Sequence, residues 1–138
     1  MWTKLNGLVL VLLWMTSFVG LALAQDDIVT KRVQFMRGSS SATVKGTLKG
    51  RETRDYVLGA KAGQTMSVKM MTKNTFLYFN VLPPQSEEAL FVDEIQGENS
   101  WSGKLPTDGA YTIRVYLVRA EARRGGKADF ECTVSIIK

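Results

Sequence analysis

Histidine is absent from this chain of 138 residues. Imidazole is the commonest general base and the commonest metal ligand, so a catalytic or metal site here would need carboxylates alone. The acidic pairs at 26–27, 87–88 and 93–94 lack the spacing of a calcium-binding loop, and nothing in the sequence places two carboxylates across a cleft. The sequence therefore predicts a protein that is not an enzyme and holds no metal ion or other cofactor. A hydrolase that uses carboxylates is the alternative.

Cysteine occurs once, at Cys132, so no disulfide can form within the chain. In the stretch FECTVSII, Phe130, Cys132, Val134 and Ile136 alternate with polar residues, which is typical of a strand with one buried face. Cys132 is therefore expected to be a small buried hydrophobe rather than a reactive thiol. An exported protein without disulfides fits a bacterial periplasm better than a disulfide-rich secretome.

Charge is nearly missing from the first 24 residues, which contain one lysine and then an uncharged apolar run ending in Ala22-Leu23-Ala24. This pattern predicts a Sec signal peptide at 1–24, cleaved at an A-x-A site, with a membrane anchor as the alternative. Residues 25–138 then form a single domain without an integral membrane segment. That domain has 17 basic and 13 acidic residues, an excess too small for a nucleic-acid partner.

Long stretches with a helical period are also missing, whereas apolar residues at every second position recur along the chain. The sequence predicts an all-β fold, an antiparallel two-sheet β-sandwich of about eight strands. Residues 76–82 are apolar on both faces and are expected to form a central strand. The expected strands lie around 33–35, 43–48, 56–60, 65–70, 76–82, 88–92, 111–117 and 130–136.

Three arginines crowd into VRAEARR, residues 118–124, and Gly125-Gly126 follows. The helix formers and the glycine stop predict a helical turn with Arg119 and Arg123 on one face. Like charges four residues apart oppose a helix, and Glu121 pairs well only with Arg124, so local energetics do not explain the cluster. The arginines either cap strand-end carbonyls and remain solvated, or form a basic loop that binds an acidic, concave partner.

Trp101 stands beside an expected turn in NSWSGKLP. Tryptophan is favoured at binding hot spots, so Trp101 is a candidate anchor for a partner. The alternative interpretation is that its ring covers one open end of the sandwich.

Three stretches carry a family resemblance: VQFMRGSSSATVKGTLKG, DYVLGAKAGQ and LPTDGAYTIRVYLVRAEARRG. Together they resemble the periplasmic inhibitors of goose-type (g-type) lysozyme of Gram-negative bacteria, over nearly all of residues 25–138. The first two stretches and the LP-x-x-G-x-Y-x-x-R-V segment are also similar to bacterial pre-peptidase C-terminal domains, which are β-sandwich accessory modules. The R-x-x-x-R pattern after the penultimate strand is more specific to the inhibitors.

The resemblance implies a periplasmic β-sandwich without activity of its own, whose loops enter the substrate cleft of a g-type lysozyme. That cleft holds the catalytic glutamate, a general acid that must reach the glycosidic oxygen. The family's paired arginines correspond to Arg119 and Arg123. A tyrosine follows the glycine of the Lys-Gly turn in that family, whereas Arg51 follows Lys49-Gly50 here, which changes the contact area available to a partner.

The expected function is inhibition of a g-type lysozyme by basic loops, which protects peptidoglycan. The partner is the lysozyme, and the candidate partner-binding residues are Arg51, Trp101, Arg119, Arg123 and Arg124. The alternative is a carbohydrate- or peptidoglycan-binding accessory module of the periplasm without inhibitory activity, in which Trp101 and strand-face tyrosines matter more than the arginines.

Overall fold

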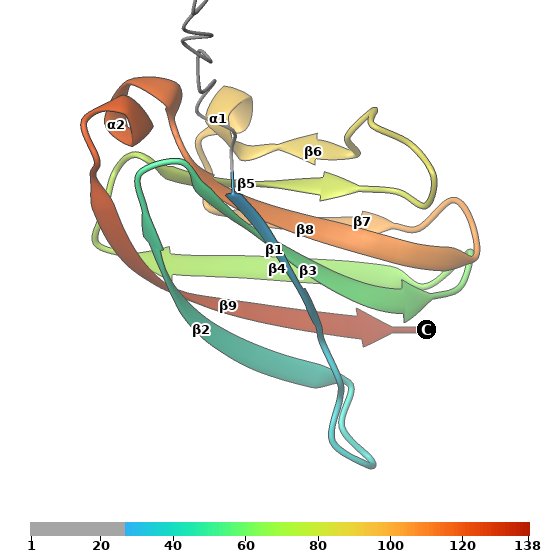
Figure 1. Cartoon of the computed structure of the whole chain (residues 1–138). Coiled ribbons are helices and arrows are strands. Elements are labelled where there is room, and N and C mark those ends of the chain that lie inside the picture. Colours follow the sequence, from blue (N-terminus) through green and yellow to red (C-terminus); the bar gives the residue numbers. More distant parts are fainter. Residues whose placement is uncertain (1–26) are drawn as a thin grey trace, which may run out of the picture.

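Two β-sheets face each other in the computed structural model, which describes residues 27–138 (Figure 1). One sheet has the order β1 (Asp27–Arg32), β3 (Glu52–Ala60), β8 (Gly109–Leu117), β5 (Leu77–Leu82) and β6 (Phe91–Val92). The other has the order β2 (Ser41–Lys49), β9 (Lys127–Ile137), β4 (Thr65–Thr72) and β7 (Ser100–Lys104). The predicted β-sandwich is confirmed. The predicted signal peptide at 1–24 lies outside the described residues.

Two short helices interrupt the strands: α1 (Asp93–Gln96) follows β6, and α2 (Arg119–Arg123) joins β8 to β9. Within residues 27–138, no helix is long and apolar enough to cross a membrane.

Alternating side chains of both sheets build one core. On β8, Tyr111, Ile113, Val115 and Leu117 point inward and are almost fully buried, whereas the residues between them face outward. On β9, Cys132 is completely buried, as predicted, and burial raises the pKa of its thiol to about 12. The hydrophobic effect over these two inner faces is the main force that holds the sheets together.

The prediction for the first strand was wrong in position. The structure places β1 at Asp27–Arg32 and not around 33–35, although Val33 is still buried in the core. β1 pairs with β3 in parallel, the one exception to antiparallel pairing among the described strands. All six residues of this edge strand are exposed, so it carries no alternating pattern that the sequence could reveal.

Two further elements differ from the prediction. Residues Ser100–Lys104 form β7, an edge strand that the sequence did not predict because its alternation consists of small and polar residues around Trp101. The predicted central strand, β5, is an interior strand between β8 and β6, but the middle of its sheet is β8.

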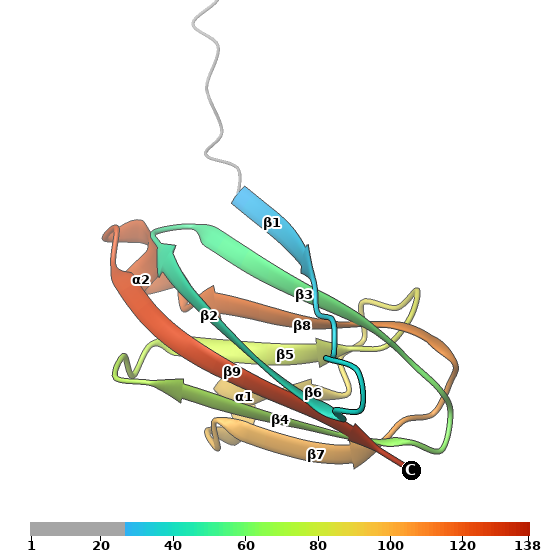
Figure 2. The same cartoon turned by 90° about the horizontal axis from the view of Figure 1, so that it is seen from below.

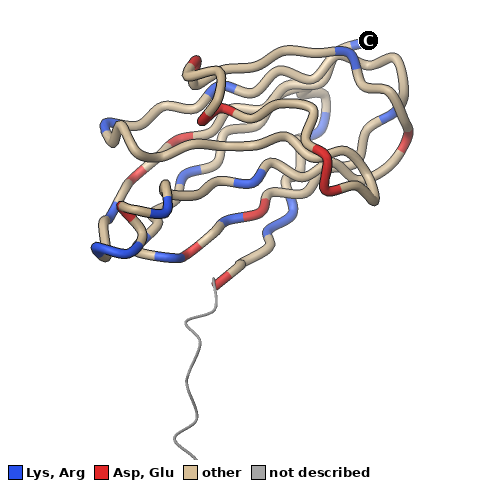
Figure 3. Tube along the Cα trace, turned by 90° about the horizontal axis from the view of Figure 1, so that it is seen from above, with Lys and Arg blue, Asp and Glu red and all other residues tan. Residues whose placement is uncertain are grey.

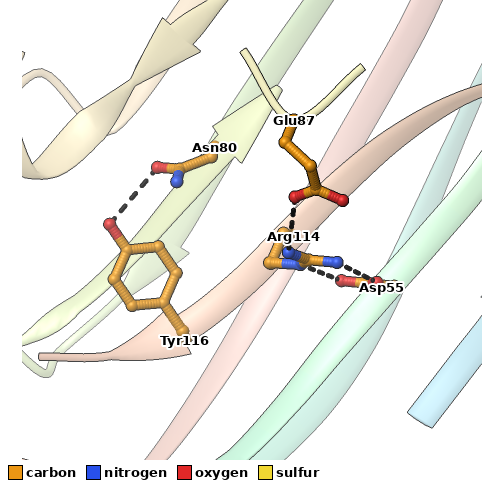
Figure 4. A network of polar contacts seen from close by, with 5 residues as sticks. All are labelled: Asp55, Asn80, Glu87, Arg114 and Tyr116. Carbon is orange, nitrogen blue, oxygen red and sulfur yellow. Dashed lines mark hydrogen bonds and ion pairs between the residues drawn. The ribbon is translucent and has the colours of Figure 1, made fainter. Parts of the chain in front are cut away.

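One buried ion pair ties β3 to β8 on the outer face of the five-stranded sheet (Figure 4). Asp55 lies opposite Arg114 in the register, and the Nε and Nη2 atoms of Arg114 each donate to one carboxylate oxygen at 2.9 Å. The hydrogen bonds from Arg114 raise its pKa and keep it charged. Glu87, from the loop after β5, adds a weaker contact at 3.8 Å. Arg114 is therefore a structural residue of the sheet.

The burial of Cys132 predicts an inert thiol. A raised pKa keeps the group protonated at neutral pH, and the thiolate is the reactive form. We expect no reaction of the folded protein with Ellman's reagent at pH 8, and one equivalent after unfolding in guanidinium. Rapid stoichiometric reaction of the folded protein would contradict the placement of Cys132 in the core.

The Asp55–Arg114 pair predicts a specific loss of stability. Asp55→Asn keeps the volume but removes the charge and one of the two oxygen acceptors, so the free energy of unfolding should fall by about 2 kcal/mol. Glu87→Gln is the matched control, because the Glu87 side chain is 90% exposed and its loss should cost less than about 1 kcal/mol. Urea denaturation measures both values. Equal values for the two variants would show that the buried pair is not a stabilising contact.

Candidate functional site

The predicted helical turn and its glycine stop are confirmed in α2. The Gly125 N–H donates to the Ala122 carbonyl, and the backbone of Gly125 has φ of 71°, a left-handed conformation that glycine adopts without strain. Gly126 lies against the Glu121 side chain. A Cβ atom at position 126 would lie 2.3 Å from a Glu121 carboxylate oxygen, so any other residue there would displace the Glu121 side chain. The two glycines therefore turn the chain sharply from α2 into β9.

The turn between β2 and β3 lies beside α2, as Figure 2 shows. The Gly50 N–H donates to the Gly126 carbonyl at 2.7 Å, which joins the two loops at the end of the β2–β9 ladder. Arg51 follows Gly50 directly. Two arginine-bearing segments that are about 70 residues apart in the sequence thus become neighbours at one end of the sandwich.

A cleft of about 730 Å³ opens at this end. Its volume lies in the range of ordinary ligand and side-chain pockets. Three of the predicted partner-binding residues line it together: Arg51, Arg119 and Arg123. The remaining lining residues are Ile28, Gly50, Glu52, Thr53, Asn80, Glu94, Arg114, Tyr116, Leu117 and Ala122.

The arginines of α2 carry charges that the fold does not neutralise. Arg119 and Arg123 are exposed, and within residues 27–138 neither makes a hydrogen bond or an ion pair. Arg114, at the floor of the cleft, is neutralised by Asp55. Figure 3 shows further basic positions at the end of the sandwich opposite the C-terminus. The cleft mouth is therefore suited to an acidic group.

Arg124 points elsewhere. It forms the ion pair with Glu121 that the sequence predicted, and its guanidinium lies 5.9 Å from the centre of the Phe76 ring. Arg124 does not line the cleft. Its contacts hold α2 against the loop between β4 and β5, a structural role that the sequence did not separate from that of Arg119 and Arg123.

Trp101 also lies away from the cleft. It stands on β7, and its ring stacks on Phe91 of β6 with 6.2 Å between centroids and 30° between the planes. Because β6 and β7 are edge strands of different sheets, this contact closes one side of the sandwich. The half-buried Trp101 ring matches the covering role that was its alternative interpretation.

Six polar residues that line the cleft were not predicted as site residues: Glu52, Thr53, Asn80, Glu94, Arg114 and Tyr116. Tyr116 of β8 has its hydroxyl 3.2 Å from Oδ1 of Asn80 on β5 and 3.1 Å from Oε2 of Glu94 on α1 (Figure 4 shows the contact with Asn80). Tyr116 alternates with the core residues of its strand, so its outward direction was readable in the sequence. The positions of Asn80 and Glu94 depend on strand pairing and on the course of the chain after β6, and no local pattern in the sequence indicates either.

A larger concavity, of about 1150 Å³, is lined by residues of β2, β9 and β4. None of the predicted partner-binding residues lines it, so we place the candidate site at the smaller, arginine-lined cleft. Among residues 27–138, no group of three or more acidic or cysteine side chains is placed to hold a metal ion.

Comparisons with known proteins identify relatives of this chain. The crystal structure of Aeromonas hydrophila PliG, "a periplasmic lysozyme inhibitor of g-type lysozyme", is 42% identical, with a TM-score of 0.76; the match covers 82% of this chain and 100% of that chain. The "inhibitor of g-type lysozyme" of Escherichia coli K12 is 28% identical over 106 residues, 75% of this chain and 78% of that protein. No protein-family model matches.

The second resemblance is confirmed at the level of fold. The pre-peptidase C-terminal domain of a Bacillus anthracis collagenase matches with a TM-score of 0.55 at 13% identity, over 80% of this chain and 97% of that one. An identity this low establishes a shared sandwich and nothing about function. The relation to the Aeromonas protein is much closer and spans that protein's full length. The chain therefore belongs to the family of periplasmic inhibitors of g-type lysozyme.

Proposed function

We propose that this protein inhibits a g-type lysozyme in the periplasm and so protects peptidoglycan, without catalytic activity of its own. The observation that carries the proposal is the convergence of Arg51, Arg119 and Arg123 on one cleft, where Arg119 and Arg123 have no partner among residues 27–138. Planar guanidinium groups bind carboxylates with paired hydrogen bonds, so an acidic substrate cleft is a complementary surface.

The mechanism is occlusion. A rigid sandwich presents α2 and the β2–β3 turn at one end, and both segments are fixed by the Gly50–Gly126 hydrogen bond. When these loops enter the lysozyme cleft, Arg119 and Arg123 are placed to pair with its carboxylates. A glycosidase needs its general acid within reach of the glycosidic oxygen, and a guanidinium at that carboxylate blocks both the access and the proton transfer.

The competing function, peptidoglycan binding, loses one of the aromatic residues that motivated it. The Trp101 ring is engaged with Phe91 and covers the edge of the sandwich. A turbidity assay of cell-wall lysis separates the two functions. Equimolar protein should abolish lysis by g-type lysozyme and leave chicken-type and invertebrate-type lysozymes active. Binding to purified peptidoglycan without inhibition would favour the accessory-module function.

Replacing both free arginines should remove most of the affinity. Each buried interface arginine contributes about 2 kcal/mol or more, so Arg119→Ala/Arg123→Ala should raise the Kd for g-type lysozyme by roughly 1000-fold. The matched control is Arg37→Ala, which removes an exposed arginine that does not line the cleft. Calorimetric titration measures the three affinities. An unchanged Kd for the folded double variant would overturn the assignment of the site.

Association should also depend on salt. Exposed charges of opposite sign on two proteins accelerate their encounter, and ions screen this attraction with a Debye length of about 8 Å at 0.15 M. We expect the association rate constant to fall by about tenfold or more between 0.02 and 0.5 M NaCl in stopped-flow measurements, and the double arginine variant to lose most of this dependence. A rate constant insensitive to salt would argue against electrostatic steering.

A further inference from the structure

Two carboxylates line the cleft beside its arginines, those of Glu52 and Glu94, and Glu94 is contributed by α1. Glu94 lines the cleft together with Arg119 and Arg123, but no ion pair joins its carboxylate to either arginine within the described residues. Its exposed carboxylate therefore faces an arginine-lined space without being neutralised by these two residues. A surface built only to receive acidic groups would not place a carboxylate there, because like charges at an interface oppose binding.

Glu94 is held in place by Tyr116. The Tyr116 hydroxyl has one hydrogen and two neighbouring oxygens, and the charged carboxylate is the stronger acceptor, so the hydrogen is donated to Oε2 of Glu94. Burial and the contact with Glu94 raise the pKa of Tyr116 above its ordinary value, so the hydroxyl keeps this hydrogen at physiological pH. The second oxygen, Oε1, makes no hydrogen bond within residues 27–138 and is available to a partner.

The helix that carries Glu94 is itself fixed. Asp93 is completely buried, and its Oδ1 atom accepts a hydrogen bond from the Asn99 N–H at 2.8 Å. The Gly97 N–H donates to the Asp93 carbonyl and ends the helix. The other carboxylate oxygen of Asp93 is buried without a hydrogen-bond partner among the described residues. A short helix held in this way presents its side chains at a low entropic cost on binding.

The same helix exposes an apolar side chain. Ile95 follows Glu94 and is 77% exposed, the second most exposed large hydrophobic residue among those described. Ile95 does not line the cleft, and consecutive residues of a helix do not share a face, so Ile95 adds apolar area near Glu94 without sharing its contact.

We propose that α1 is a second contact element, in which Glu94 accepts a hydrogen bond from a lysine or arginine of the target lysozyme. The inference rests on the proposed function and deepens it. The arginines engage the acidic cleft that g-type lysozymes need for catalysis. Glu94 of α1 binds a basic residue beside that cleft, so the inhibitor selects lysozymes that have a basic residue there. Tyr116 is a positioning residue that acts through Glu94.

The test is whether removing the charge of Glu94 weakens or strengthens binding to the lysozyme. If Glu94 contacts a cation of the partner, Glu94→Gln should raise the Kd for g-type lysozyme by about 30-fold or more. If Glu94 only opposes an acidic partner, the same variant should bind as tightly as the wild type or more tightly, and the inference is overturned. The matched control is Glu98→Gln, an exposed glutamate of the same loop region that does not line the cleft, whose Kd should stay within about twofold.

Tyr116→Phe tests the positioning role, because it keeps the ring and removes the hydroxyl. It should raise the Kd by about 3- to 10-fold, mainly through faster dissociation, and have no further effect in the Glu94→Gln background. An additive effect of the two substitutions would contradict action through Glu94. Thermal melting of each variant confirms that it is folded.

The outcomes also separate this inference from the proposed function. Loss of binding in the Arg119→Ala/Arg123→Ala variant, with unchanged affinity for Glu94→Gln, leaves the inhibitor standing and removes the role of α1. A wild-type protein that binds no g-type lysozyme overturns both.

Discussion

The register between β2 and β9 is the constraint on which the site depends. The two strands pair without interruption from Ser41 opposite Ser135 to Lys49 opposite Lys127, and the hydrogen bond from Gly50 to Gly126 continues the pairing into the loops. A shift of one residue would turn the buried side chains of β2 and β9 to solvent, so burial fixes the register. The fixed register in turn places Arg51 beside α2.

Strand β8 connects this framework to the chemistry of the cleft. Its inward residues form the middle of the core, and its outward residues Arg114 and Tyr116 lie at the floor of the cleft. Arg114 is neutralised by Asp55 and joins β8 to β3, whereas Tyr116 joins β8 to α1 through Glu94. The core that stabilises the sandwich therefore also fixes the position of Arg114 in the cleft and, through Tyr116, that of Glu94 on α1.

The sequence predicted what depends on local pattern and missed what depends on distant pairing. Alternation located the strands that have one buried face, and the glycine pair located the end of α2. It missed β1, which is exposed on both faces, and β7, whose small residues alternate weakly. The arginine cluster was visible in the sequence itself, and the family resemblance singled out Arg119 and Arg123. The opposing Glu94 was not found, because α1 reaches the cleft only through the pairing of β5, β6 and β8.

The four arginines from β8 to the end of α2 provide an internal comparison of structural and functional charge. Arg114 is bound to Asp55, and Arg124 is bound to Glu121 and lies over Phe76, so the fold places partners for arginines that serve stability. Arg119 and Arg123 come from the same stretch of chain and are left without partners within the described residues, although like charges at this spacing oppose the helix that carries them. Folding gains nothing from this arrangement. In the proposed complex, carboxylates of the lysozyme offset the cost to the helix, and we therefore propose the binding role for Arg119 and Arg123 rather than for their paired neighbours.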